Sequence, residues 1–186
     1  SPRRLTPRVL VFQGLRFEVV PSRFKEALDK ASFPAPYAYA METAKQKALE
    51  VAARMYQVSG RGWEGGRRPR GVRPVTSRAS CRLNGKEHSV FTGVAIIHCC
   101  SKGGQLDTDV CQFHEETTVR FSRLSEELLW EYIDSGEPMD KAGGYGIQAL
   151  GGMLVEYVRG DFLNVVGFPL NHFCKKLVEL YYPPGR

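Results

Sequence analysis

The run from Gly136 to Gln148 has the composition of a binding site. It reads GEPMDKAGGYGIQ and combines two acids, one lysine, several glycines and, at its end, the side-chain amide of a glutamine. Glycine lets backbone N–H groups approach an anion closely, and Lys141 adds a charge that attracts phosphate oxygens. The amide of Gln148 both donates and accepts, so it could bind the edge of a base. The run therefore indicates a phosphate site, with a plain glycine-rich turn as the alternative.

The wording Asp-Lys-Ala-Gly-x-Tyr-Gly-Ile-Gln within this run resembles the signature loop of the Maf family. Members of that family are nucleoside triphosphate pyrophosphatases, which hydrolyse a nucleotide to its monophosphate and pyrophosphate. The resemblance covers residues 14–57 and 82–183. It implies an α/β fold like that of inosine triphosphate pyrophosphatase, in which helices flank a long, twisted mixed sheet with a nucleotide cleft. It also implies pyrimidine substrates such as dTTP and UTP. The similarity is greatest to Maf-like domains that precede a methyltransferase-like domain.

The resemblance assigns four side chains to the substrate. Lys47 and Lys141 would hold phosphates, and Gln148 would select the base. Arg3 would add a phosphate contact, because Ser-Pro-Arg-Arg at the start of the sequence is similar to the end of a family motif. A basic terminus without such a role is the alternative for Arg3.

A divalent cation, Mg²⁺ or Mn²⁺, is expected to bridge the phosphates. Glu26 and Asp140 are the candidate acids near it, and an ordinary surface glutamate is the alternative for Glu26. His88 could contact substrate, but a lone histidine is more often a structural hydrogen-bonding residue.

The interval after Gln57 departs from the family pattern. The family places a Gly-Ala-Asp-Thr strand end and a Lys-Pro motif here, and that aspartate is the presumed general base. Neither motif is present. Since loss of a general base costs about 10²–10⁴ in rate, a catalytically inactive relative that binds nucleotides or a protein partner is the alternative function. Whether Asp140, Glu137 or another acid substitutes stays open.

The same interval carries the net charge of +6. Residues 58–85 hold seven arginines against one acid, so the remaining sequence is balanced. Glycine, proline and arginine without apolar periodicity predict that 58–81 is a disordered or non-homologous insert within one domain, 1–186. An RNA-binding tract is a further interpretation, but Trp63 alone offers a stacking platform there, so nucleic acid is not the expected partner.

Composition gives the broader expectations. No run of about twenty apolar residues or signal-peptide pattern is present, so the sequence predicts a soluble cytoplasmic protein with no membrane partner. Five cysteines without a CxxC pair indicate neither a zinc site nor a complete disulfide framework. A homodimer is one option for its assembly.

Periodicity and punctuation predict the elements that position these residues. Helices are expected from Tyr37 to Gln57, from a Ser125 cap toward Gly136, and from Leu170 to Tyr181. Strands are expected at five segments: 14–22, 90–99, 116–121, 153–158 and 164–168. The strand at 90–99 is expected to be buried on both faces.

Overall fold

The computed structural model describes residues 17–58, 82–102 and 105–182. Arg3 and nearly all of the predicted insert at 58–81 lie outside this range. The described residues form two compact units. Unit 1 contains Phe17, 82–90 and 115–182, and unit 2 contains 18–58, 91–102 and 105–114. The two units are described separately below.

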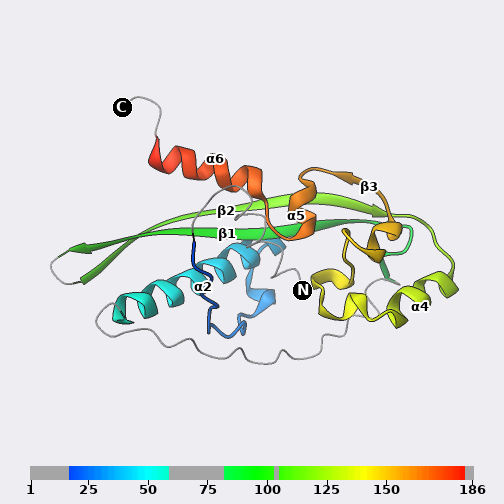
Figure 1. Ribbon diagram of the computed structural model, residues 1–186, viewed down its shortest axis with the longest axis horizontal. Coiled ribbons are helices and arrows are strands. Elements are labelled where there is room, and N and C mark those ends of the chain that lie inside the picture. Colours follow the sequence, from blue (N-terminus) through cyan, green and yellow to red (C-terminus); the bar gives the residue numbers. More distant parts are fainter. Residues whose placement is uncertain (1–16, 59–81, 103–104, 183–186) are drawn as a thin grey trace. The chain divides into compact units, whose positions relative to one another are not determined.

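Three strands form one sheet in the order β1-β2-β3 (Figure 1). They are β1 (Glu87–Lys102), β2 (Gln105–Phe121) and β3 (Val155–Arg159). The boundary between the units crosses both long strands, after Val90 in β1 and after His114 in β2. The predicted α/β class is confirmed, and the sheet that the described residues form is antiparallel.

Unit 2 is built on helix α2 (Pro36–Val58), which confirms the predicted helix. A short 3-10 helix, η2 (Lys30–Ser32), precedes it, and Asp29 caps η2 by accepting from the Ala31 N–H at 3.0 Å. At Gly93 of β1, an added Cβ would fall well inside contact distance of the Ala40 backbone. The absence of a side chain at Gly93 is therefore what lets α2 pack directly against β1.

The segment before η2 does not form the predicted strand in its described part, from Phe17 to Ser22. Side chains of α2 form hydrogen bonds with this segment instead. Glu50 accepts from the Ser22 hydroxyl at 2.9 Å and from the Arg23 N–H at 2.8 Å. Arg54 donates to the Pro21 carbonyl at 2.8 Å. These contacts hold the segment along the helix instead.

Strand β1 is longer than predicted and is not buried on both faces. Val94 is buried, whereas His98, Cys99 and Cys100 are exposed. The run of β-branched and apolar residues therefore gave the strand type correctly and its burial incorrectly.

Unit 1 has a core formed by β2, α4 and the segment that follows α4. Helix α4 (Glu126–Asp134) begins at the predicted cap, where the Ser125 hydroxyl accepts from the Leu128 N–H at 3.4 Å. Leu129 and Tyr132 face inward and are almost fully buried. The core cluster contains these two side chains together with Val119, Phe121, Tyr145 and Leu154.

The predicted strand at 164–168 is wrong, because its first three residues belong to helix α5 (Phe162–Val166). Asp161 caps the helix by accepting from the Leu163 N–H at 2.8 Å, and Gly167 ends it at a φ of 137°. Buried Asn164 donates its amide to the Val90 carbonyl at 3.1 Å and to the Thr117 hydroxyl at 3.0 Å. Helix α6 (Leu170–Tyr181) then follows with the bounds that were predicted.

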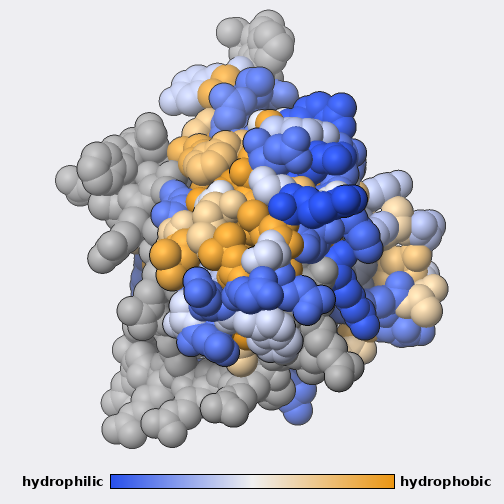
Figure 2. Space-filling view, turned by 90° about the vertical axis from the view of Figure 1, so that its right-hand side faces the viewer, coloured by the Kyte–Doolittle hydropathy of each residue, from blue (hydrophilic) through white to orange (hydrophobic). Residues whose placement is uncertain are grey.

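Apolar side chains gather on the face of the molecule seen in Figure 2, bordered by hydrophilic ones. Exposed apolar residues of unit 1 include Trp130 of α4 and Leu150 and Met153 beyond it. Among the described residues, no helix is long and apolar enough to cross a membrane.

The Gly93 contact gives a prediction for stability. Gly93→Ala should lower the free energy of unfolding by about 1–3 kcal/mol, because the new methyl group displaces the α2 backbone. Urea unfolding followed by circular dichroism measures this effect. Ser101→Ala, at an exposed position of the same strand, is the control. Equal stability of the two variants would contradict the close packing of α2 on β1.

Candidate functional site

The signature loop of unit 1 contains three short 3-10 helices around one carboxylate. They are η3 (Glu137–Asp140), η4 (Ala142–Gly144) and η5 (Leu150–Leu154). Glu137 begins η3, and its carboxylate accepts from the Leu150 N–H and the Gly151 N–H, each at 3.0 Å. The side chain of the first 3-10 helix thus anchors the start of the third.

Tyr132 of α4 adds a second connection to the same carboxylate. Its hydroxyl donates to Glu137 Oε1 at 3.2 Å and accepts from the Gly146 N–H at 3.1 Å. Tyr132 is 1% exposed, so the core of unit 1 fixes its position. Through this hydroxyl, the loop is attached to the most buried side chain of α4.

Gly146, Gly151 and Gly152 lie where the loop is most crowded, and a Cβ at Gly152 would lie 2.8 Å from the Ile147 carbonyl oxygen. A Cβ at Gly146 would lie 2.9 Å from Lys141 Cε and 3.2 Å from Glu137 Oε1. A Cβ at Gly151 would lie 2.7 Å from the Tyr132 hydroxyl and 2.8 Å from the Gly146 nitrogen. These glycines therefore serve close packing within the loop, rather than only the approach of an anion.

The two predicted ligand-binding residues of the loop differ in their surroundings. Lys141 is half-buried, and its Nζ donates to the Glu137 carbonyl at 3.3 Å. Gln148 is exposed, in the turn before η5. Asp140 ends η3, and its side chain is not among those that the structure describes. Lys141 and Gln148 thus lie in one loop, where the first side chain is half-buried and the second is exposed.

Glu137 is poorly suited to replace the missing general base. A carboxylate offers about four acceptor positions, and three donors already occupy the two oxygens of Glu137. A base must present a free lone pair to water, and these donors leave Glu137 about one such position, on Oε2. The geometry therefore favours an anchoring role for Glu137.

His88, at the start of β1, belongs to the core beneath the loop. Its Nε2 lies 3.0 Å from the Tyr145 hydroxyl, and its ring packs edge-on against Phe121 and Tyr145 with centroids 5.0 and 5.6 Å away. Burial lowers the pKa of His88 and raises the pKa of the Tyr145 phenol. Both side chains are therefore neutral at pH 7, and the contacts favour the structural interpretation of His88.

In unit 2 the structure brings Lys47 and Glu26 together as an ion pair. Both side chains are partly exposed, at 35% and 44%. Lys45, on the same helix, pairs with Glu42 at 3.5 Å instead. The helix thus presents two lysines in different settings, and only Lys47 contacts a predicted metal-site acid.

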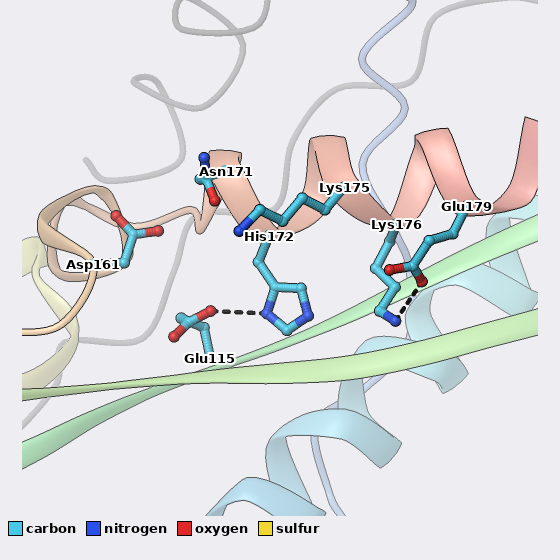
Figure 3. Close-up of a pocket in the computed structure, with 7 residues that line it drawn as sticks. All are labelled: Glu115, Asp161, Asn171, His172, Lys175, Lys176 and Glu179. Carbon is cyan, nitrogen blue, oxygen red and sulfur yellow. Dashed lines mark hydrogen bonds and ion pairs between the residues drawn. The ribbon is translucent and has the colours of Figure 1, made fainter. Parts of the chain in front are cut away.

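A polar pocket of about 550 Å³ also lies in unit 1, between β2 and α6 (Figure 3). His172 Nδ1 lies 2.8 Å from Glu115 Oε2, and Lys176 Nζ lies 2.6 Å from Glu179 Oε2. Asp161 also lines the pocket. Of the predicted site residues whose side chains are described in unit 1, neither Lys141 nor Gln148 lines this pocket.

Sequence reasoning missed the roles of Tyr132 and Glu137. The sequence indicated Glu137 only as an acid of the loop and a possible substitute for the general base, and it gave no polar role to Tyr132. The partners of Glu137 lie thirteen and fourteen residues further along the chain, beyond any local pattern. A tyrosine on the buried face of α4 was the one available signal, because a buried hydroxyl needs a hydrogen-bond partner.

These observations define an α/β protein with a glycine-rich loop anchored on a buried core. Residues 76–180 match the family model described as Maf-like protein. The human "Probable bifunctional dTTP/UTP pyrophosphatase/methyltransferase protein" is 66% identical over 199 residues, covering 99% of this chain and 31% of that protein. The chain therefore spans about a third of the length of this relative.

Two other relatives match over nearly their whole length. A dTTP/UTP pyrophosphatase of Thermococcus onnurineus (strain NA1) is 43% identical over 189 residues, covering 97% of this chain and 94% of the relative. A dTTP/UTP pyrophosphatase of Bacillus thuringiensis subsp. konkukian (strain 97-27) is 34% identical, with 96% and 91% covered. The chain belongs to the Maf family.

The lowered pKa of His88 gives a pH prediction. Because the folded protein favours neutral His88, the stability gained is present above the ordinary histidine pKa of about 6.5 and is lost as pH falls toward the lower folded value. The urea concentration at the unfolding midpoint should therefore decrease when the pH is lowered from about 7.5 to about 5.5.

The matched variant is His88→Gln, which keeps a polar amide but does not titrate. Its midpoint should depend less steeply on pH than that of the unmodified protein. The same pH dependence in both proteins would show that His88 does not contribute.

Proposed function

We propose that this chain is a nucleoside triphosphate pyrophosphatase that acts on dTTP and UTP. The observation that carries the proposal is the match to dTTP/UTP pyrophosphatases over nearly the full length of both chains. The anchored glycine-rich loop supports it, because the structure holds Lys141 and Gln148 within a single loop.

The proposed substrate contacts divide by chemistry. Lys47 and Lys141 carry positive charge toward the triphosphate and stabilise the departing pyrophosphate. Gln148, exposed in its turn, selects the base through its amide. Arg3 stays a predicted phosphate contact, outside the described residues.

A divalent cation, Mg²⁺ or Mn²⁺, is part of the proposal. Within the described ranges, no three potential ligands among His, Cys, Asp and Glu lie together. We therefore do not propose a metal site formed by protein ligands alone. Mg²⁺ at phosphate sites needs only one or two carboxylates together with substrate oxygens. Glu26 fits this requirement as a partly exposed carboxylate beside a lysine, and Asp140 stays the second candidate. The cation would neutralise phosphate charge and polarise the reacting phosphoryl group.

The missing aspartate keeps a second candidate function in place. Glu64 is the one acid between residues 58 and 85, and no Gly-Ala-Asp-Thr occurs. The alignment with the human relative covers more positions than this chain has residues, so that relative carries residues without a counterpart here. A Maf-type protein that binds nucleotide without hydrolysing it is therefore the alternative.

Pyrophosphate release from dTTP and UTP, with Mg²⁺ or Mn²⁺, tests the proposal. It should be measured on this chain and on a version that carries the family's Gly-Ala-Asp-Thr segment. Turnover by both proteins supports the proposed enzyme and places the base elsewhere. Turnover only by the restored version, with nucleotide binding by both, supports the inactive alternative.

Substitution of Lys47 gives a sharper prediction. Lys47→Ala should weaken triphosphate binding about 10- to 100-fold, because a charge-assisted contact to phosphate is lost. Lys45→Ala is the matched control on the same helix and should bind as the unmodified protein does. Equal effects of the two substitutions would contradict the role of Lys47.

The remaining partners and location stay predictions. We expect a cytoplasmic protein that uses nucleotides rather than nucleic acid, with a homodimer as one option. Light scattering measures the last point directly.

A further inference from the structure

Gln148 lies in a turn that backbone hydrogen bonds close within the loop. The Ala149 N–H donates to the Gly146 carbonyl at 3.2 Å, and the Gly152 N–H donates to the Ala149 carbonyl at 3.0 Å. The side chain of Gln148 is exposed, so no packing of its own fixes the direction of its amide. The position of that amide depends on how firmly the turn is held.

Both ends of this turn reach the Glu137 carboxylate. Leu150 and Gly151, after the turn, donate to it directly at 3.0 Å. Gly146, before the turn, donates to Tyr132, whose hydroxyl in turn donates to Glu137 at 3.2 Å. One side chain therefore closes a ring of contacts around the residue that is proposed to select the base.

The ring needs an acceptor with two oxygens. An ionised carboxylate only accepts, and it can take several N–H and O–H donors at once. A glutamine at the same position would turn an NH₂ group toward at least one of these donors, and that donor would lose its partner. The crowding at Gly146 and Gly151 leaves little room for another arrangement.

Lys141 is held differently from Gln148. Its Nζ donates to the backbone carbonyl of Glu137 at 3.3 Å. A change confined to the end of the Glu137 side chain therefore leaves that backbone acceptor in place, while the turn that carries Gln148 loses its anchor.

We infer that Glu137 is a positioning residue that determines base selectivity, because its carboxylate fixes the turn that presents Gln148. The inference rests on the function proposed above. It separates two parts of nucleotide recognition: the Glu137 carboxylate governs the choice of base and leaves the affinity for the triphosphate group unchanged.

The first experiment does not depend on any ligand. In Glu137→Gln, hydrogen exchange of the Leu150 and Gly151 amides should accelerate about tenfold or more, since both lose a charge-assisted partner. In Tyr132→Phe, acceleration should be limited to Gly146, because the direct contacts to Glu137 remain. Exchange rates unchanged in Glu137→Gln would overturn the anchoring role.

The second experiment measures binding of three probes by calorimetry: the α,β-imido analogues of dTTP and dGTP, and inorganic tripolyphosphate. Glu137→Gln should reduce the preference for the dTTP analogue over the dGTP analogue about tenfold. Affinity for tripolyphosphate should not change. Glu131→Gln, at an exposed position of α4, is the matched control and should bind all three probes as the unmodified protein does.

Two results would overturn the selectivity role. One is an unchanged preference between the analogues, and the other is an equal loss of affinity for all three probes, which marks a merely structural effect. Failure of the unmodified protein to bind any probe would instead refute the proposed function, and the selectivity role with it. The exchange experiment still decides whether Glu137 anchors the turn.

Discussion

The pairing of β1 with β2 is the constraint on which the rest of the structure depends. Each strand contributes one part of its length to unit 1 and the other part to unit 2. The register of this one ladder therefore sets which residues face α2 in one unit and α5 in the other, because a shift of one residue would reverse every side chain. Along β1, Gly93 lies against Ala40 in unit 2, and Val90 accepts from Asn164 in unit 1.

Within unit 1, the signature loop is stabilised mainly by polar contacts to buried groups. Its residues form short 3-10 helices rather than a longer element, so many backbone groups lack helical partners. Glu137 and Tyr132 supply partners for three of these groups. The glycines of the loop allow this close packing.

The sequence predicted the elements whose signals are local. Pro36 and the apolar periodicity located α2, and the Ser125 cap located α4. It failed where a distant partner decides the conformation. Phe17–Ser22 contacts the side chains of a helix, and the run at 164–168 begins within a helix that Asp161 caps and Gly167 ends. For the candidate site, sequence identified residue types in the loop, but the connection from Glu137 to Leu150 and Gly151 required coordinates.

The glycine at position 93 has a consequence for how variants of this protein would be interpreted. Ala40 and Lys47 lie seven residues apart on α2, which is two turns or about 10 Å along one face. A larger residue at position 93 would push the whole helix, and the ammonium group of Lys47 would move with it. A neutral change inside the sheet could thus produce the same assay result as the loss of a surface charge, and only its lowered stability would reveal the difference.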